Sequence, residues 1–511
     1  MKKQTWRRHH KWFGLVMGFF LVMFCWSGIV LNHRQLVAGA DISRKWLPNS
    51  YRFKDWNGGL VRGELVDSAS GKVYIYGNAG VFETSLARDD YKPFSDGMPE
   101  GVDNRNVRGM AMVGSNGSPT LLCLTTTALY RANGGSWQEI NIYSGNIPSE
   151  NNGEIEKTDI EPERLSDLEV AGDTVIVVGR SHLFRAVTDC ADGGLHFERL
   201  TLPAPPDSDG KVTLFRTLWT LHSGEMFGTL GKVLMDCVAL ILIILYITGV
   251  IFWFAKPSVR RGGAKGTAEQ PKKVVRPSAL RTSLLRHSYK WHDVIGRKTI
   301  VLTLFVCLTG WCLRPPLMIL GVLTRVSPIP YTVLDSPNAW ADKLRALRYD
   351  ADRGDWLLSS SEGFYSLASL TSVPAKIEVA PPVSVMGINV LRREGGVWLV
   401  GSMRGLFVWH RASGTVVDYF SGCVPEVGGM PVGDYAICGW MADAPVDYSA
   451  GSAVAEMPNW MAALPMSLWN VALEVHTGRI YTFMGSLSTL LWVFLAGAGA
   501  VWVIWTGRKI S

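Results

Sequence analysis

The stretch that decides the fold is RRHHKWFGLVMGFFLVMFCWSGIVL, residues 7–31. It begins with basic and imidazole side chains and then continues from Trp12 to Leu31 without a charged residue. Twenty helical residues at 1.5 Å each span about 30 Å, which is the thickness of the hydrocarbon core of a bilayer. The basic start resembles that of a signal peptide, but the run is long and no small-x-small cleavage site precedes Asn32. We therefore expect a retained transmembrane helix.

Three further apolar runs follow, at Cys237–Ala255, Thr299–Leu313 and Ile480–Thr506. The run Thr299–Leu313 ends at Arg314-Pro315-Pro316, because proline lacks a backbone donor and clashes with the preceding turn. The fold class that we expect is a mixed membrane protein with a four-helix transmembrane bundle. Four spans place both chain ends on the same side of the membrane.

The distribution of positive charge predicts the topology. The formal net charge is +7, and the basic residues gather before the first run, between Lys256 and Lys298, and at Arg508-Lys509. Cytoplasmic flanks of membrane helices carry such an excess. We expect a bacterial inner-membrane protein with cytoplasmic termini, periplasmic inserts and membrane lipid as a partner. The sequence has no nucleic-acid-binding motif, so we expect no nucleic-acid partner.

These features divide the chain into seven segments. They are helix 1 (1–33), periplasmic insert 1 (34–218), helix 2 (219–256), a basic cytoplasmic linker (257–283), helix 3 (284–324), periplasmic insert 2 (325–468), and helix 4 with its cytoplasmic tail (469–511).

Both inserts repeat one β-hairpin pattern, in which an apolar alternating run and a turn lead to a Leu/Val-aromatic pair or its equivalent. The second strands of these hairpins end at Phe82, Tyr130, Phe184, Tyr365 and Phe407. Gaps of 42 to 54 residues within each insert are close to the period of propeller blades. We expect one all-β, propeller-like domain built from both inserts, although any β domain would contain such hairpins. Cys423 and Cys438 lie in the second insert and could form a disulfide in an oxidising compartment.

Histidines recur at matching places in the two halves of the chain. His10 and His292 each precede a glycine by four residues near the cytoplasmic start of a span. His222 and His476 each precede Ser/Thr-Gly before the second and fourth spans. A single interfacial histidine needs no functional explanation. Pairs that match across a repeat at each membrane face favour ligands, because polar groups at this depth are costly and usually functional.

The chemistry that suits this arrangement is haem ligation. Neutral imidazole binds haem iron, zinc and copper, whereas zinc would require three or four protein ligands that are not arranged here. We predict two bis-histidine haems, with His10 and His292 at the inner site and His222 and His476 at the outer site. His33 is an alternative ligand at the outer site, and His9 and His287 are alternatives at the inner site.

Cations and glycines near the histidines would assist a haem. The candidate propionate partners are Arg7, Arg8, Arg286 and Lys290 inside, and Lys232 or Arg479 outside. The glycines that could admit a flat macrocycle, or serve helix packing, are Gly14, Gly28, Gly249, Gly296 and Gly310.

His10-Lys11-Trp12-Phe13-Gly14 followed by Ser27-Gly28 resembles the entry helix of the PepSY-associated transmembrane family. Leu221-His222-Ser223-Gly224 and Thr248-Gly249 resemble its second-helix signature. Members of this family include inner-membrane reductases of ferric siderophores, with four helices, haem between them and outward domains. The resemblance implies haem ligands at His10 and His222, with His292 and His476 as their repeat partners. The family's usual outward modules are small α/β domains, whereas these inserts have β patterns throughout.

Together these observations predict a haem-dependent oxidoreductase that passes electrons to a periplasmic ferric siderophore or similar chelate. The sequence has no nucleotide-binding fingerprint, so we expect quinol or a separate reductase as the electron donor. The alternative from another functional class is a non-catalytic, membrane-anchored propeller that binds or senses a ligand.

Overall fold

The computed structural model divides into two compact units, each described here by itself. A helical unit contains residues 1–37, 210–335 and 469–511, and a β unit contains residues 38–209 and 336–468. The structure describes residues 3–114, 119–143, 146–148, 155–157, 162–187, 195–254, 279–382, 387–425, 435–482 and 485–510. Most of the linker expected at 257–283 lies outside these described residues.

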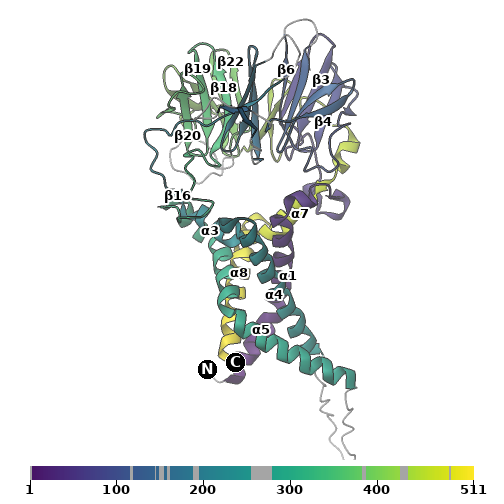
Figure 1. Ribbon diagram of the computed structural model, residues 1–511. Coiled ribbons are helices and arrows are strands. Elements are labelled where there is room, and N and C mark those ends of the chain that lie inside the picture. Colours follow the sequence, from purple (N-terminus) through teal and green to yellow (C-terminus); the bar gives the residue numbers. More distant parts are fainter. Residues whose placement is uncertain are drawn as a thin grey trace, which may run out of the picture. The chain divides into compact units, whose positions relative to one another are not determined.

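Four helices of the helical unit are long and apolar enough to cross a membrane. They are α1 (Lys3–Asn32), α4 (Gly228–Phe254), α5 (Ala279–Cys312) and α8 (Ser486–Ile510). Helices α1 and α5 each pack against both α4 and α8, so the four close into a bundle (Figure 1). At Gly18 of α1 a Cβ would lie 2.3 Å from the ring of Tyr246 on α4, so glycine permits the close packing of these helices.

Two short helices that precede the second and fourth spans are separate elements, whereas the segments expected for helix 2 (219–256) and helix 4 (469–511) each included part of one. Helix α3 (Leu214–Ser223) starts at Thr213, whose hydroxyl accepts a hydrogen bond from the Arg216 amide, and ends at Gly224 with φ +80°. Helix α7 (Leu468–Thr477) ends before Gly478, which has φ +75°. The left-handed glycines let the chain turn between each short helix and the span after it.

The remaining helices and strands of the helical unit are short. Helices α2 (Arg34–Val37) and α6 (Leu317–Leu323) flank the spans, and α6 follows the proline pair that ends α5. Strand β16 (Val212–Thr213) pairs with β17 (Arg325–Val326). Residues 210–218 and 325–335, expected within the inserts, therefore belong to the helical unit.

The β unit consists of small antiparallel sheets. Five of the described sheets have four strands each, in sequence order. The first insert forms three of them: β2 (Gly63–Asp67), β3 (Lys72–Gly77), β4 (Gly80–Ser85) and β5 (Lys92–Pro93); β6 (Val107–Val113), β7 (Thr120–Thr125), β8 (Leu129–Asn133) and β9 (Ser136–Ile140); and β12 (Leu165–Ala171), β13 (Thr174–Gly179), β14 (Leu183–Val187) and β15 (Glu198–Leu200). The second insert forms two: β18 (Leu344–Asp350), β19 (Asp355–Ser360), β20 (Gly363–Leu367) and β21 (Ala375–Lys376); and β22 (Val390–Glu394), β23 (Val397–Ser402), β24 (Gly405–His410) and β25 (Thr415–Asp418). Three are two-stranded: β26 (Ile437–Met441) with β27 (Ala444–Asp447), β10 (Asn146–Pro148) with β11 (Ile155–Lys157), and β1 (Asp41–Ile42) with β28 (Met466–Ser467).

The side chains of successive strand residues explain why these sheets are packed on both faces. In β13, Val175 and Val177 belong to one core cluster, and Ile176 and Val178 belong to the next. Successive side chains of a strand point to opposite faces, so a strand that is apolar at every position is buried on both sides.

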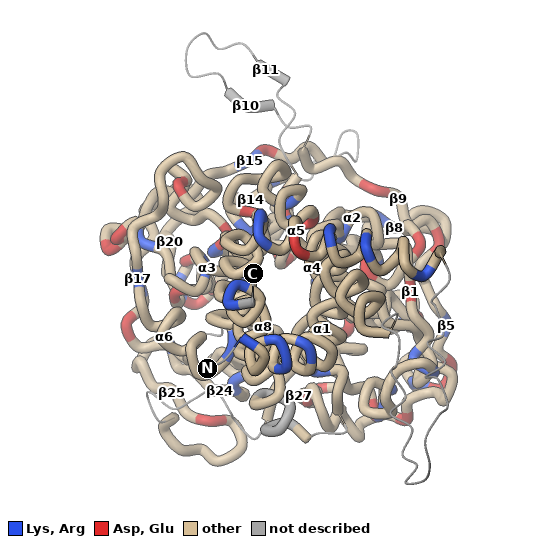
Figure 2. Tube along the Cα trace, turned by 90° about the horizontal axis from the view of Figure 1, so that it is seen from below, with Lys and Arg blue, Asp and Glu red and all other residues tan. Residues whose placement is uncertain are grey.

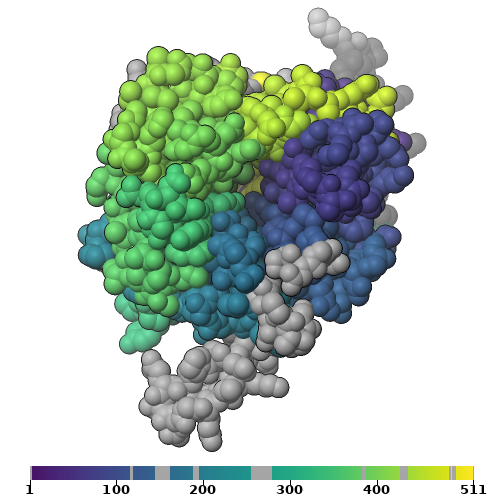
Figure 3. Space-filling view, turned by 90° about the horizontal axis from the view of Figure 1, so that it is seen from above, coloured from purple at the N-terminus to yellow at the C-terminus, as the bar shows by residue number. Residues whose placement is uncertain are grey.

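Six apolar clusters join the five four-stranded sheets and the β26–β27 sheet in cyclic order. Clusters lie between the first and second sheets, the second and third, and so on, and the last one packs Cys438 and Met441 of β26 against Val73 and Ile75 of β3. In Figure 3 the yellow-green surface of the second insert accordingly lies beside the purple-blue surface of the first. The two inserts thus share one continuous core.

All five hairpins expected from the sequence are antiparallel pairs in the middle of four-stranded sheets. The sequence missed the β26–β27 pair, because its second strand reads Ala-Pro-Val-Asp and lacks the aromatic end. Cys423 and Cys438 are free thiols, the first exposed and the second buried.

Candidate functional site: paired histidines in the helical unit

The inner pair of imidazoles joins the first and third spans. His10 on α1 and His292 on α5 have ring centroids 6.0 Å apart, with their planes at 71°. Nδ1 of His10 lies 3.0 Å from the carbonyl oxygen of Val503 on α8. Nδ1 of His292 lies 2.9 Å from the carbonyl oxygen of Leu245 on α4. All four membrane helices therefore contribute to this site.

The outer pair comes from the two short helices. His222 on α3 and His476 on α7 have ring centroids 6.1 Å apart, with their planes at 47°. Nδ1 of His476 lies 2.9 Å from the carbonyl oxygen of Phe24 on α1. His222 makes its backbone hydrogen bond to Val306 on α5. The short helices carry the imidazoles, and the long helices orient them.

One motif anchors all four histidines. Each ring meets a backbone carbonyl, and its Nδ1 meets the hydroxyl of the Ser or Thr three residues later, which precedes a glycine. The four anchors are Val503/Thr506-Gly507 for His10, Leu245/Thr248-Gly249 for His292, Phe24/Ser27-Gly28 for His476 and Val306/Thr309-Gly310 for His222. The Nδ1-to-hydroxyl distances are 3.1 to 3.3 Å. Sequence reasoning quoted two of these Ser/Thr-Gly pairs but did not recognise the hydroxyls as anchors.

The anchors fix the tautomer of each ring. A carbonyl oxygen only accepts hydrogen bonds, so Nδ1 must carry the proton and donate it. In a neutral imidazole, Nε2 then keeps its lone pair. Among the described residues, Nδ1 makes the hydroxyl contacts of all four rings and the carbonyl contacts of His10, His292 and His476. Nε2 of each ring therefore remains free for a ligand as far as the contacts of Nδ1 decide it.

Burial keeps the outer imidazoles neutral. Desolvation, together with the nearby Arg314 and against the backbone hydrogen bond to Val306, lowers the pKa of His222 to about 4. Desolvation also lowers the pKa of His476 to about 3, with His222 and Arg314 acting in the same direction. Both rings are therefore uncharged at neutral pH, as a metal ligand must be.

Glycine at the anchors gives the imidazole edge room beside the backbone. A Cβ at Gly310 would lie 2.7 Å from Cε1 of His222, and one at Gly28 would lie 3.3 Å from Cε1 of His476. At Gly14 and Gly296 the nearest atoms would be 3.8 and 3.6 Å away, at ordinary contact distance. The anchor glycines therefore accommodate an imidazole directly, which is a different role from the contact with a macrocycle that the sequence suggested.

The three alternative histidines lie in different surroundings. Nε2 of His33 is 2.6 Å from the carboxylate of Asp236, so this nitrogen already has a partner. His287 is exposed, and its Nδ1 lies 2.9 Å from the carbonyl oxygen of Ser283 on its own helix. His9 packs against Phe13 and Trp502, and its buried Nδ1 has no hydrogen-bond partner among the residues that the structure describes. Within the described residues, none of these three rings faces a second imidazole.

A partly buried cation, Arg314, which the sequence treated only as part of a helix break, lies at the outer pair. Arg314 donates a hydrogen bond of 3.4 Å from Nη2 to the carbonyl oxygen of His476. Desolvation, together with Arg479, lowers the pKa of Arg314 to about 10, so it remains charged at neutral pH. Arg479, an expected propionate partner, forms an ion pair with Glu474 at 2.5 Å. The four expected inner cations (Arg7, Arg8, Arg286 and Lys290) are exposed.

The donor set fits haem better than a protein-only metal cage. The described residues hold no group of three or more His, Cys, Asp or Glu side chains arranged for a metal ion. Two imidazoles bound on opposite sides of one metal, at about 2 Å each, have ring centroids about 6 Å apart. Buried Nε1 atoms of Trp311 and Trp492 in the bundle also lack a hydrogen-bond partner among the described residues.

Residues 1–256 match the family described as "PepSY-associated TM region". The chain belongs to this family. The matched half contains His10, His222 and the anchors Ser27-Gly28 and Thr248-Gly249, which are the motifs that carried the resemblance in the sequence.

Other comparisons add little to the family assignment. No curated protein matches this PepSY-associated TM protein. Two solved structures from B. thetaiotaomicron, described as extracellular domains of a hybrid two-component and a one-component system, align with 10% and 11% identity. They cover 73% and 72% of this chain, which spans only 30% and 29% of theirs. Both TM-scores are 0.28, which is too low to indicate a shared fold.

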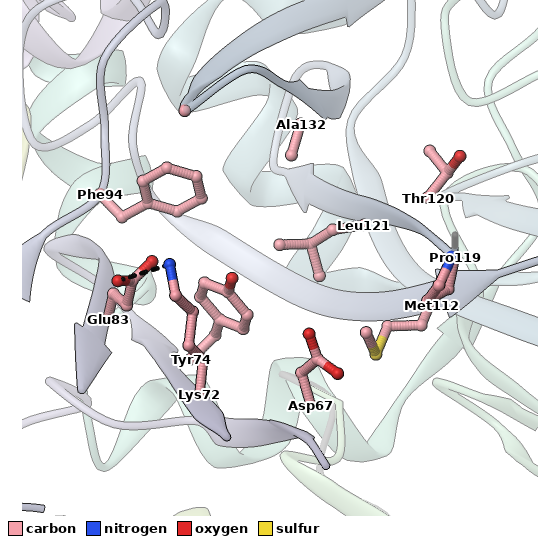
Figure 4. A pocket seen from close by; sticks show the side chains of 11 residues that line it. Asp67, Lys72, Tyr74, Glu83, Phe94, Met112, Pro119, Thr120, Leu121 and Ala132 are labelled. Atoms are coloured by element: carbon pink, nitrogen blue, oxygen red, sulfur yellow. Dashed lines mark ion pairs between the residues drawn. The ribbon is translucent and has the colours of Figure 1, made fainter. Parts of the chain in front are cut away.

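The β unit of this PepSY-associated TM protein has its own cavity, of about 300 Å³, between the first two sheets (Figure 4). Lys72 and Glu83 on its wall form an ion pair at 2.9 Å. Asp67 accepts hydrogen bonds from the Ala69 amide and from Ser70. Its charged groups thus already have partners, so this cavity gives no sign of a charged ligand.

Proposed function

We propose that this PepSY-associated TM protein is a dihaem oxidoreductase that carries electrons across the membrane. The observation that carries the proposal is the paired geometry: two sets of imidazoles at 6.0 and 6.1 Å, each ring held by Nδ1 with Nε2 available. His10 with His292 would hold the inner haem, and His222 with His476 would hold the outer one. A haem held there would carry one electron at a time, and the substrate would not need to bind to the iron through an oxygen atom.

The protein's part in this function is to hold and orient the ligands. The carbonyl anchors fix both the ring tautomer and the ring direction, as outer-shell partners of metal-bound histidines do. The hydroxyls of Ser27, Thr248, Thr309 and Thr506 support the same nitrogen. We propose Arg314 as the cation for a haem propionate at the outer site, because it is charged and lies, partly buried, close enough to act on both rings.

We propose a ferric siderophore or similar chelate as the electron acceptor, with quinol or a separate reductase as the donor. This proposal rests on the family membership and on the absence of a nucleotide-binding fingerprint in the sequence. Reduction of the chelate would consume one electron for each ferric ion and yield a ferrous ion.

The proposed topology has both termini in the cytoplasm and both inserts in the periplasm. The start of α1 and the end of α8 lie at the same end of the bundle, and blue basic segments surround the N and C labels in Figure 2. An excess of Lys and Arg is typical of cytoplasmic flanks. We expect a reporter fused after Ser511 to show cytoplasmic activity, and one inserted at Ser208 to show periplasmic activity. The opposite pattern would contradict this orientation.

We also propose that the β unit is a six-bladed propeller, with β26–β27 as an incomplete sixth blade. The cyclic order of the six apolar clusters supports this arrangement. A density map of the purified chain that lacks six sheets packed around one axis would refute it.

The alternative function is ligand sensing by a protein without a redox cofactor. Such a function would use the β unit alone.

Absorption spectroscopy of the purified full-length protein tests the function. We expect a red protein with a Soret band and, after dithionite reduction, a sharp α band typical of bis-histidine haem. Anaerobic addition of a ferric siderophore should reoxidise the reduced protein, with one ferrous ion formed per electron lost. A colourless protein from haem-replete cells would overturn the proposal, and a red protein that no ferric chelate reoxidises would overturn the assigned acceptor.

A further inference from the structure

The two inserts meet at two junctions in the β unit, and a glutamate crosses each of them. At one junction β12 of the first insert packs against β18 of the second, and at the other β2 packs against β26. Glu169 on β12 accepts a hydrogen bond of 3.1 Å from the Tyr349 amide. Glu64 on β2 accepts one of 2.9 Å from the Ala442 amide. Each carboxylate therefore ties the first insert to the backbone of the second.

The two glutamates differ in how their charge is balanced. Both carboxylate oxygens of Glu64 accept hydrogen bonds from Nη2 of Arg88, at 2.9 and 3.1 Å. Oε2 of Glu169 lies 3.5 Å from Nη1 of Arg348, which is a looser contact. Glu64 thus has a close cation of its own, whereas Glu169 has only a more distant one.

Arg348 is already engaged with another carboxylate at the β12–β18 junction. Its Nη1 and Nη2 both donate to Asp167, the latter at 3.2 Å. Asp167 also accepts a hydrogen bond of 3.0 Å from the Leu347 amide. Charge-assisted, two-pronged contacts of this kind are the strong ones, so Asp167 holds the guanidinium group more tightly than Glu169 does. One cation therefore serves two carboxylates.

The shortage of positive charge matters because this junction is largely shielded from water. The side chains of Glu169, Asp167 and Arg348 are 17%, 9% and 25% exposed. Burial raises the pKa of Glu169 to about 7, and Asp167 acts in the same direction, against Arg348 and the Tyr349 amide. Tyr76 on β3 interacts electrostatically with Arg348 and Asp167, and burial raises its pKa to about 12, so it stays neutral. Glu169 consequently gains or loses its proton close to neutral pH.

We propose that Glu169 makes the β12–β18 junction a pH-sensitive contact between the two inserts. The protonated side chain still accepts the Tyr349 amide and brings no charge into a buried place. When the proton leaves, the junction holds two carboxylates and one guanidinium group, and β12 packs less stably against β18. This junction lies entirely within the β unit and does not depend on the proposed haem function.

The direction of the effect follows from the pKa of Glu169 in the closed and open junction. The closed junction keeps the proton up to about pH 7, whereas an exposed glutamate releases it near its ordinary value of 4.5. The stabilisation is therefore complete below about pH 4.5 and is lost as the pH rises through about 7. Between about pH 6 and pH 8 the ratio of closed to open junction should fall about tenfold.

Hydrogen–deuterium exchange of the full-length protein in detergent tests this junction. Peptides that cover β12 and β18 are compared at the lower and the higher pH, after correction for the intrinsic pH dependence of amide exchange. In the unaltered protein we expect their protection to fall about tenfold at the higher pH. Glu169→Gln keeps an oxygen that accepts the Tyr349 amide but cannot ionise, so its protection should be nearly the same at both pH values.

Glu64→Gln is the matched control, because it makes the same change at the β2–β26 junction. Loss of its ion pair with Arg88 should lower the protection of β2 and β26 while the pH effect at β12 and β18 remains. Asp167→Asn is a second test: it leaves Arg348 to Glu169 alone, so the pH effect should shrink. No pH effect in the unaltered protein, or an undiminished effect in Glu169→Gln, overturns the proposal. Haem is not part of these measurements, so failure here is distinct from failure of the proposed redox function.

Discussion

Replacing either outer histidine with alanine should remove about half of the haem from the purified protein. His222→Ala and His476→Ala each leave a single imidazole at the outer site, where the ring centroids are now 6.1 Å apart. A bis-histidine site with one ligand removed loses low-spin coordination and most of its affinity for haem. The measurement is haem per protein by pyridine haemochrome, together with the α band of the reduced protein. The two variants should lose the same spectral component.

His33→Ala is the matched control for these two variants. His33 is near the outer end of α1, but its Nε2 already bonds to Asp236 at 2.6 Å. We expect this variant to keep full haem content. The inner pair predicts the complementary result: His10→Ala and His292→Ala should remove the other spectral component. If both outer variants keep all of their haem, or if His33→Ala loses half, the outer site has been assigned wrongly.

The second large effect on haem content is expected from Gly310→Ala, a substitution that adds a single methyl group. In Gly310→Ala the new Cβ would lie 2.7 Å from Cε1 and 3.3 Å from Nε2 of His222. The ring cannot retreat easily, because the Thr309 hydroxyl holds its Nδ1 and the ring also makes a backbone hydrogen bond to Val306. We therefore expect the imidazole to move off its anchor, and the protein to lose most of the outer haem while it keeps the inner one.

Gly296→Ala provides the control on the same helix. Its Cβ would lie 3.6 Å from the nearest atom, Cδ2 of Leu245, so the same change should leave both haems in place. Gly28→Ala, with 3.3 Å to Cε1 of His476, should give an intermediate loss. Circular dichroism confirms that each variant retains its helices. Equal haem loss in Gly310→Ala and Gly296→Ala would show that helix packing, and not imidazole clearance, is disturbed.

Much of this arrangement could be predicted from the sequence, because the relevant signals are local. The uncharged run from Trp12 to Leu31 indicates a membrane span, and the short run of mainly β-branched apolar residues at Val175–Val178 indicates a strand buried on both faces. The pairing of His10 with His292, and of His222 with His476, followed from the repeated spacing of histidine and glycine. The structure brings these rings together, while their role as ligands stays a prediction.

The features that the sequence missed depend on contacts between distant residues. Thr506-Gly507 resembles any small pair in a membrane helix until His10, almost 500 residues earlier, is placed against it. Arg314 attracted notice only as part of a helix break, because nothing local shows that it folds back onto His476. Recurrent Ser/Thr-Gly pairs were the one available signal for the anchors.

The pairing of β1 with β28 has a consequence for how the protein is made. Asp41 pairs with Ser467, and Ile42 with Met466, so one end of the first insert finds its partner only near the end of the chain. Ribosomes add roughly 5–20 residues per second, so the interval of about 425 residues takes about 20–85 s. During that time the first insert has already left the ribosome, but the face of β3 that later packs against Cys438 and Met441 is still uncovered. We expect holding chaperones of the receiving compartment to matter more for this chain than for one whose β unit is translated without interruption.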